Sequence, residues 1–125
     1  MLPFKVQFTQ GRPVYEQVLF AAKKAIVSGQ LKPGDPFPSV RVLSQELRIN
    51  PNTAQKVSAR LREEGLIEVQ SGLGSIISAN ARALKSQKKE LLERELEWLV
   101  VEAKKLKLSE KDLLTAIKSH WKNLS

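Results

Sequence analysis

The segment from Pro38 to Ser78 constrains the fold of this chain more than any other part of the sequence. Its pattern of apolar, polar and turn-forming residues predicts a short helix, a tight turn, a second helix and a two-stranded hairpin. Between residues 41 and 62 five basic residues stand against one acid, Glu46; the basic residues are Arg41, Arg48, Lys56, Arg60 and Arg62. A helix pair with a polar, basic second helix and a hairpin behind it is typical of a winged helix-turn-helix that contacts DNA.

Polar caps and a proline mark the starts of both helices of this pair. Ser39 is placed to cap the first helix, and Asn50 is placed to cap the second. Pro51 then takes the first helical position, where a backbone N–H is not needed. The first helix is expected to bury Val40, Leu43 and Leu47, and the second Ala54, Val57, Ser58 and Leu61. Gly65 is expected to end the second helix.

A further helix is expected before this pair. Pro13 fits its first turn and Gly29 is a plausible end. One face carries apolar residues at helical spacing, which are Val14, Val18, Ala21 or Ala22, Ala25 and Ile26. Residues 1–12 are expected to be extended, and the turn formers of 31–38 leave room for a very short strand only.

The hairpin after Gly65 is expected to form the wing. Leu66 to Gln70 favours a strand, residues 71–74 a turn, and residues 75–78 a return strand. We therefore predict a mainly α fold with a small β wing, with the winged helix-turn-helix domain spanning residues 12–78.

Residues 79–125 differ from the rest and predict a two-helix region. Ala81 to Lys107 contains neither Gly nor Pro, and its apolar stripe is expected at Leu84, Leu91 or Leu92, Leu96, Leu99, Ala103 and Leu106. Ser109 to Asp112 resembles a capping box that starts a last helix. That helix is expected to bury Leu113, Ile117 and Trp121. Two helices of this length do not easily enclose a metabolite pocket, but they can pack against a second copy.

Charge and composition favour a nucleic-acid partner. The chain of 125 residues carries a formal net charge of +8, with a pI of about 9.9, and an excess of positive charge points to an anionic partner. No apolar run approaches the roughly 18–20 residues that cross a bilayer, and the first residues lack the pattern of a secretory signal. Cysteine is absent, which fits a reducing compartment. We expect a cytoplasmic protein without a membrane partner.

Short polar side chains at the start of the second helix of the pair are the main candidates for base contacts. Asn50, Asn52 and Thr53 lie in its first turn, with Gln55 and Lys56 one turn later. Asn and Gln can bond adenine through two hydrogen bonds, and Thr can contact a thymine methyl. The alternative for Asn50 is a role as helix cap only, and for Thr53 a role as an ordinary helical residue.

Basic and glycine residues complete the candidate set. Arg41 stands at the start of the first helix of the pair, where it fits a phosphate or guanine contact or is a simple surface charge. Gly72 and Gly74 allow a tight hairpin whose backbone comes close to phosphate or to the minor groove; between strands, their spacing does not indicate a dinucleotide site. The candidate DNA-binding residues are Ser39, Arg41, Asn50, Asn52, Thr53, Gln55, Lys56, Arg60 and Gly72.

Three stretches resemble one family. "FPSVRVLSQEL", "INPNTAQKV" and "LREEGLIEVQSGLGS" are similar to the winged-helix head of GntR-family bacterial transcription regulators, and Asn50-Pro51-Asn52-Thr53 resembles the YtrA-type subfamily. The resemblance covers about residues 12–78. It places Arg41, Asn50, Asn52, Thr53, Gln55 and Gly72 at DNA-contacting positions. Two features depart from the family pattern: Val40 stands where Glu is frequent, and the tip over 71–74 lacks the usual basic residues, so the wing is expected to bind through its backbone.

The resemblance also implies a role for residues 79–125. YtrA-type members have a short two-helix tail that forms a dimer, and they often control transporter operons. The residues expected at such a dimer contact are Leu92, Leu96, Trp98, Leu99, Ala103, Leu113, Ile117 and Trp121. Both tryptophans are interpreted as packing anchors rather than ligand stackers.

The resulting prediction is a sequence-specific, homodimeric repressor that binds a two-fold-symmetric DNA operator, without a cofactor or metal. An enzyme is not expected, because the only histidine, His120, has no metal or catalytic partners grouped around it and the acids show no pairing. One alternative is a winged helix used for protein assembly, although the polar, basic second helix of the pair argues against it. An RNA-binding winged helix is disfavoured by the few aromatic residues. Whether a small effector molecule is bound is open.

Overall fold

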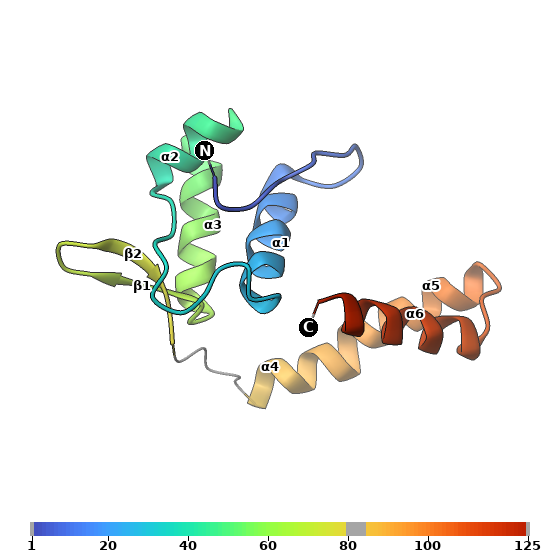
Figure 1. Cartoon of the computed structure of the whole chain (residues 1–125). Helices are drawn as coiled ribbons and strands as arrows, with labels where there is room; N and C mark the ends of the chain where they lie inside the picture. The colour runs from blue at the N-terminus through green and yellow to red at the C-terminus, as the bar shows by residue number, and fades with distance from the viewer. Residues whose placement is uncertain (1, 80–84, 125) are drawn as a thin grey trace. The chain divides into compact units, whose positions relative to one another are not determined.

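The chain divides into two structural units, Met1–Arg82 and Ala83–Ser125. The computed structural model describes residues 2–79, called the head below, and residues 85–124, called the tail. The head contains α1 (Val14–Val27), α2 (Val40–Leu47), α3 (Pro51–Glu63), β1 (Ile67–Gln70) and β2 (Gly74–Ile77) (Figure 1). The tail contains α4 (Lys85–Glu90), the π-helical turn η1 (Leu91–Glu95), α5 (Leu96–Lys105) and α6 (Glu110–Asn123). The predicted mainly α fold with a small β wing is confirmed. Among the described residues, no helix is long and apolar enough to cross a bilayer.

The starts of α2 and α3 lie where the sequence predicts them. The Ser39 hydroxyl oxygen accepts a hydrogen bond from the Val42 backbone N–H at 3.2 Å. The Asn50 side-chain oxygen accepts one from the Asn52 backbone N–H at 2.8 Å, and Pro51 holds the first helical position. These caps satisfy N–H groups that have no partner within a helix. They fix the first residue of each helix, and the Asn50 cap sets the direction in which α3 leaves the turn after α2.

Three helices pack around one apolar core. The predicted stripe of α3 is buried in full and consists of Ala54, Val57, Ser58 and Leu61. α1 contributes Val18, Ala22 and Ala25, and α2 contributes Leu43. α1 begins one residue after Pro13, whose carbonyl accepts from the Gln17 N–H at 3.2 Å. Because α1 and α2 cover the inner side of α3, its opposite side is left to solvent.

The N-terminal segment is part of this core, which the sequence did not predict. Phe4 is 4% exposed, and its ring stacks on that of Phe37 with 5.9 Å between centroids. Residues 2–9 include no helix or strand, so the expected extended backbone is found. Its apolar side chain nevertheless closes one side of the head.

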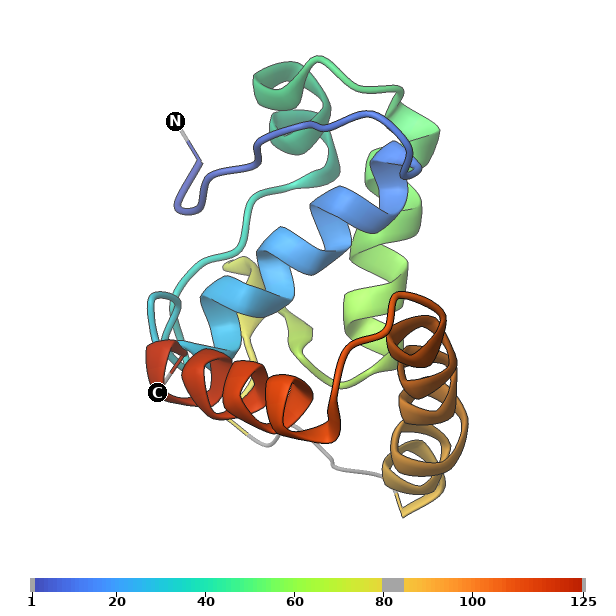
Figure 2. The ribbon, with the colours of Figure 1, turned by 90° about the vertical axis from the view of Figure 1, so that its right-hand side faces the viewer.

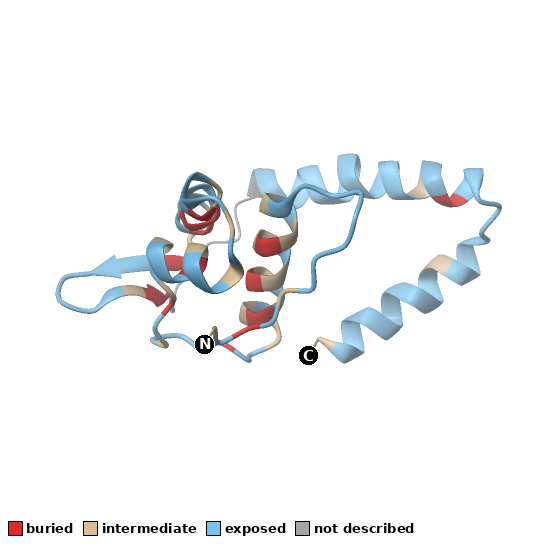
Figure 3. Ribbon diagram, turned by 90° about the horizontal axis from the view of Figure 1, so that it is seen from above, coloured by how far each residue is buried: buried red, intermediate tan, exposed pale blue. Residues whose placement is uncertain are grey.

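The wing is joined to the loop before α2. β1 and β2 pair antiparallel, with Ile67 opposite Ile77 at the base and Gln70 opposite Gly74 at the tip. The short strand expected within 31–38 is a single bridge between Pro36 and Ile76, and the Phe37 N–H donates to the Ser75 carbonyl at 2.8 Å. Figure 3 shows the wing extending from the head with buried residues at its base only.

The tail contains a π-helical turn where an unbroken α-helix was predicted over 81–107. The Leu96 N–H donates to the Leu91 carbonyl, five residues back instead of four. The sequence left open whether Leu91 or Leu92 belongs to the apolar stripe. The π turn adds one residue to the helical turn before Leu96, so the side chains before and after it are rotated relative to one another. Helical structure is described from Lys85 to Lys105, and Leu84 lies outside the described residues.

The tail buries little within its own chain. Of its large apolar residues only Val100, Leu113 and Leu124 are half-buried, and Ala103 is buried at the turn, where the Leu108 N–H donates to its carbonyl at 2.9 Å. The prediction that α6 buries Leu113, Ile117 and Trp121 is wrong within one chain for Ile117 and Trp121, which are exposed, and Leu113 is half-buried. Figure 3 shows α4, α5 and α6 almost entirely in the colour of exposed residues.

The predicted capping box starts α6 and gives it an acid-sensitive end. The Ser109 hydroxyl accepts from the Asp112 N–H at 3.1 Å, and the Asp112 carboxylate accepts from the Ser109 N–H at 2.9 Å. The hydrogen bond from the Ser109 backbone N–H lowers the pKa of the Asp112 carboxyl below its ordinary value of 3.8, and a hydrogen bond with the Ser109 side chain lowers it further. A carboxylate with a lowered pKa stabilises the folded state above its ordinary pKa, and this contribution is lost as the pH falls through the lowered value.

We therefore expect the first turn of α6 to fray on acidification. In an acid titration followed by NMR, the Ser109 amide should lose its protection from solvent exchange as Asp112 is protonated. The Asp112→Asn variant should show weak protection of this amide at every pH, without that transition. A Ser109 amide whose protection does not change below pH 3.8 would exclude the Asp112 contact.

Candidate nucleic-acid interface

The exposed side of α3 presents the predicted base-contacting residues along one face. Asn52, Lys56 and Ala59 are exposed and follow one another at helical spacing, and Gln55 is exposed beside them. From Asn52 to Lys56 the helix rises about 6 Å, which is less than two base-pair steps. This face is opposite to the buried stripe, so no part of the helical core covers it.

The first turn of α3 combines a structural role with a candidate recognition role. Asn50 caps the helix through its side-chain oxygen, which leaves the amide nitrogen as the group it can offer to a base. Thr53 is half-buried, so less of its side chain reaches outward than of Asn52. The cap interpretation of Asn50 is confirmed, and a base contact by the same side chain is compatible with it.

Residues at the start and end of α2 are exposed as well. Arg41 is exposed in the first turn of α2, and Ser39 is exposed and uses its hydroxyl as the cap. Arg48 ends α2 in the left-handed conformation, with φ of 54°, a conformation that a non-glycine residue rarely adopts. It carries an exposed basic side chain in the turn between the two helices.

Arg60 lies at the far end of α3 and has carboxylate partners. Its Nε donates to Glu64 Oε2 at 2.8 Å, and Nη1 lies 3.7 Å from Glu63 Oε1. The Glu64 charge raises the pKa of the guanidinium. Glu64 Oε1 also contacts Lys23 Nζ of α1 at 2.7 Å. The helix rises about 12 Å from Asn52 to Arg60. The i, i+4 spacing of Arg60 and Glu64 is a sequence signal that could have revealed this pairing.

The tip of the wing offers backbone and uncharged side chains. Gly72 and Gly74 have φ of 82° and 74°, in the left-handed region that glycine adopts without strain. Both are exposed. No residue from Val69 to Ile77 is charged, so the wing cannot contribute an ion pair with phosphate.

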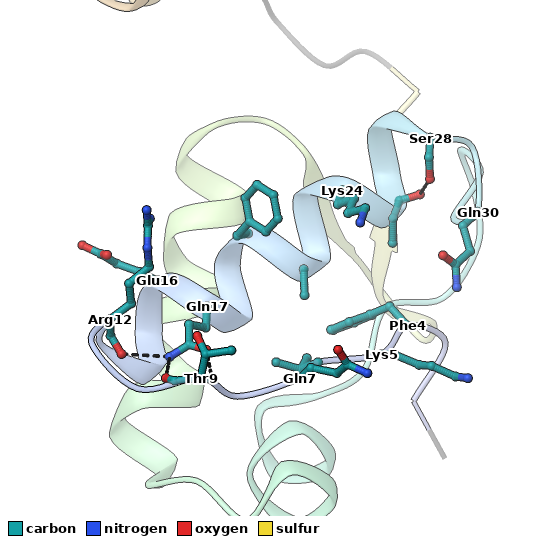
Figure 4. Close-up of a pocket in the computed structure, with 14 residues that line it drawn as sticks. Phe4, Lys5, Gln7, Thr9, Arg12, Glu16, Gln17, Lys24, Ser28 and Gln30 are labelled. Carbon is teal, nitrogen blue, oxygen red and sulfur yellow. Dashed lines mark hydrogen bonds between the residues drawn. The ribbon is translucent and has the colours of Figure 1, made fainter. Parts of the chain in front are cut away.

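A groove lies elsewhere on the head, between the N-terminal segment and α1. It encloses about 710 Å³ and is lined by residues that include Phe4, Val6, Phe20, Ala21, Lys24 and Gln30. Figure 4 shows the Gln17 side chain bridging this segment: its amide nitrogen donates to the carbonyls of Thr9 and Arg12, and its oxygen accepts from the Thr9 N–H. The candidate DNA-binding residues do not line the groove.

The predicted dimer residues differ in their accessibility to a partner. Leu92, Leu96, Trp98, Leu99, Ile117 and Trp121 are exposed within the chain, and Leu113 is half-buried. Ala103 is 3% exposed, so its methyl group already packs inside the tail. His120 is exposed on α6, and within residues 2–79 and 85–124 no group of His, Asp and Glu side chains could hold a metal ion.

Residues 14–77, from the start of α1 to the end of β2, match the family described as bacterial regulatory proteins, gntR family. The chain belongs to the GntR family. The match spans all three helices of the head and both strands of the wing. Membership of a family of regulatory proteins confirms the prediction of a transcription regulator rather than an enzyme.

Relatives of this GntR-family chain extend into the tail. The HTH-type transcriptional repressor YtrA of Bacillus subtilis is 39% identical over 92 residues, covering 73% of this chain and 71% of that protein. The uncharacterized HTH-type transcriptional regulator YhcF of the same organism is 32% identical over 113 residues, covering 90% and 93%. The predicted resemblance to the YtrA type is thus confirmed.

A solved structure supports the same fold across the chain. A protein described as a transcriptional antiterminator from Listeria monocytogenes matches 97% of this chain and 91% of its own, with a TM-score of 0.81 and 24% identity. At this level of identity the likeness concerns the fold. A winged helix-turn-helix followed by C-terminal helices is therefore an arrangement that this GntR-family chain shares with a known protein.

Proposed function

We propose that this GntR-family regulator is a homodimeric repressor that binds a two-fold-symmetric DNA operator. The observation that carries the proposal is the exposed face of α3, where polar and basic side chains stand free of the core at the positions from which helix-turn-helix proteins contact base edges. The name of the B. subtilis relative, a transcriptional repressor, supports repression rather than activation.

The candidate residues divide into two groups by what they can read. Asn52, Thr53 and Gln55, together with the free amide nitrogen of Asn50, are suited to base edges. Arg41, Lys56 and the hydroxyl of Ser39 are suited to phosphate and position the helix in the groove. Gly72 brings the wing backbone close to DNA. Arg60 is proposed as a peripheral contact, because reaching phosphate requires it to leave Glu64.

Exposed apolar side chains of the tail support a dimer. Large apolar residues are exposed on both helical segments, and they are Leu91, Leu92, Leu96, Trp98, Leu99, Val101, Leu106, Leu108, Leu114, Ile117 and Trp121. Exposed apolar side chains in this number on two short helices mark an interaction site. A second copy presents the same residues, so a two-fold contact buries them on both chains at once.

A two-fold dimer fixes the form of the operator. Two α3 helices related by a two-fold axis read half-sites separated by about one helical turn, or a multiple of it. We propose that the protein acts on DNA in the cytoplasm and, from its YtrA type, that it controls a transporter operon.

Selection of binding sites from random DNA duplexes should return a two-fold consensus. A consensus without two-fold symmetry would contradict the dimeric mode, and no enrichment at all would favour the protein-assembly alternative.

The two groups of residues predict two different binding defects. Asn52→Ala should cost about 1–3 kcal/mol on the selected operator and relax the preference at one base position in each half-site. Lys56→Gln should weaken binding to all duplexes alike and lower the slope of log K against log salt by up to about 0.9 for each phosphate that is no longer neutralised. Fluorescence anisotropy at several salt concentrations, on the operator and on single-base variants, separates these effects.

A matched control for the charge change is Lys118→Gln, which removes one exposed lysine from α6. Its salt slope should equal that of the unmodified protein. If Lys56→Gln and Lys118→Gln behave alike, Lys56 makes no phosphate contact. If Asn52→Ala leaves every base preference unchanged, α3 does not read the operator through Asn52.

A further inference from the structure

The outer half of the wing carries exposed apolar side chains and no charge. Val69 and Leu73 are both exposed, Leu73 to 68%. Glu68 and Arg82 are the charged residues nearest to Leu73 in the sequence, on either side of a charge-free stretch. A wing drawn to DNA by phosphate would carry lysine or arginine at its tip. Besides its backbone, this wing can therefore offer DNA only uncharged side chains, and the exposed apolar ones are Val69 and Leu73.

Two glycines leave the Leu73 side chain isolated at the tip. Gly72 and Gly74 flank it, and a Cβ added at either would meet nothing within 4 Å. The Leu73 N–H donates to the Gln70 carbonyl at 3.1 Å, which closes the turn. The tip is therefore a narrow two-stranded end from which one branched aliphatic side chain projects.

The wing is positioned to reach DNA beside α3. It extends from the side of α3 that lies away from α1 (Figures 1 and 3). α1 lies beside α3 (Figure 2). The buried stripe of α3 faces the helical core, so its polar face is turned away from that core. When α3 occupies a major groove, a projection beside it meets the neighbouring minor groove, which is about 6 Å wide in B-DNA. A glycine-flanked hairpin end suits a groove of that width better than a tip with bulky neighbours.

We propose that Leu73 enters the minor groove flanking each half-site and makes the operator's flanking sequence part of its specificity. The inference rests on the proposed DNA-binding function. The leucine side chain packs against the groove walls and favours A·T pairs, because a G·C pair places the guanine 2-amino group on the groove floor. Apolar side chains inserted in this groove also exploit base steps that unstack easily. Specificity here comes from groove shape, not from charge.

Substitution of Leu73 separates apolar contact from charge. Leu73→Ser should weaken binding to the selected operator at least about tenfold, as expected from the partial burial of two leucine side chains, one in each wing, and leave the salt slope unchanged. Leu73→Lys should steepen the slope of log K against log salt by up to about 0.9 for each wing that gains a phosphate contact. The matched control is Val27→Ser, at the end of α1, where an apolar side chain is 62% exposed; it should bind like the unmodified protein.

Inosine substitution tests the groove directly. Replacing flanking A·T pairs by G·C should weaken binding of the unmodified protein, and replacing them by inosine·C, which lacks the 2-amino group, should restore it. The Leu73→Ser protein should not distinguish the three duplexes. Circular dichroism melting confirms that each variant is folded.

Two results would overturn the proposal, and a third concerns the proposed function. Leu73 makes no groove contact if Leu73→Ser binds like the Val27→Ser control. Leu73 does not contact the floor of the groove if Leu73→Ser binds more weakly but keeps the full discrimination between G·C and inosine·C flanks. If the unmodified protein enriches no duplex at all, the DNA-binding function itself fails, which is a different outcome from either of these.

Discussion

Ile117→Glu is expected to abolish high-affinity operator binding while leaving the head folded. Ile117 is 42% exposed on α6, on the face that we propose contacts a second copy. An unpaired charge buried at an apolar contact costs about 3–5 kcal/mol, so the dimer should dissociate and operator affinity should fall at least about 100-fold. Analytical ultracentrifugation should show the mass of one chain, and anisotropy should show only the weak binding of a single head.

The control for this variant places the same charge on the other side of the same helix. Ser119 is exposed and lies two residues from Ile117, which is about 200° around an α-helix. Ser119→Glu should therefore remain dimeric and bind the operator normally. If Ile117→Glu also remains dimeric with unchanged affinity, the apolar face of α6 is not the interface, and the contact must be sought on α5 around Trp98, whose side chain is 69% exposed.

Local signals in the sequence accounted for most of the head. The bounds and buried stripe of α3 follow from Asn50, Pro51 and a 3.6-residue apolar period, and each of these acts within one or two turns of helix. The capping box of α6 is equally local. The same locality identified the exposed face of α3, because the outer positions of an amphipathic helix follow once its buried positions are known.

Features that depend on distant residues were not predictable in this way. The stacking of Phe4 on Phe37 joins residues far apart in the sequence, and no period or cap indicates it. The π turn at Leu91–Glu95 changes the phase of a helix whose composition favours an ordinary α-helix throughout. At the wing, the lack of basic residues predicts weak phosphate binding. That Leu73 projects from between two glycines could be seen only from the conformation of the turn.

The N-terminal segment gives the second large prediction, which concerns stability. Phe4→Ala should lower the free energy of unfolding of the head by about 3–5 kcal/mol, the usual cost of removing a buried phenylalanine side chain. The effect should reach the DNA-binding face, because Phe37, the stacking partner, is bonded to Ser75 of the wing and stands two residues before the Ser39 cap of α2. Urea unfolding followed by circular dichroism measures the change.

Phe8→Ala provides the comparison within the same segment, since Phe8 is 44% exposed and should cost less than about 1 kcal/mol. The contrast decides where the folding unit begins. A large effect at Phe4 with a small one at Phe8 means that the domain includes residues before α1, so a fragment starting at residue 12 would be a poorer DNA-binding protein than the full chain. Equal, small effects would show that the Phe4–Phe37 stack contributes little and that the head folds from α1 onward.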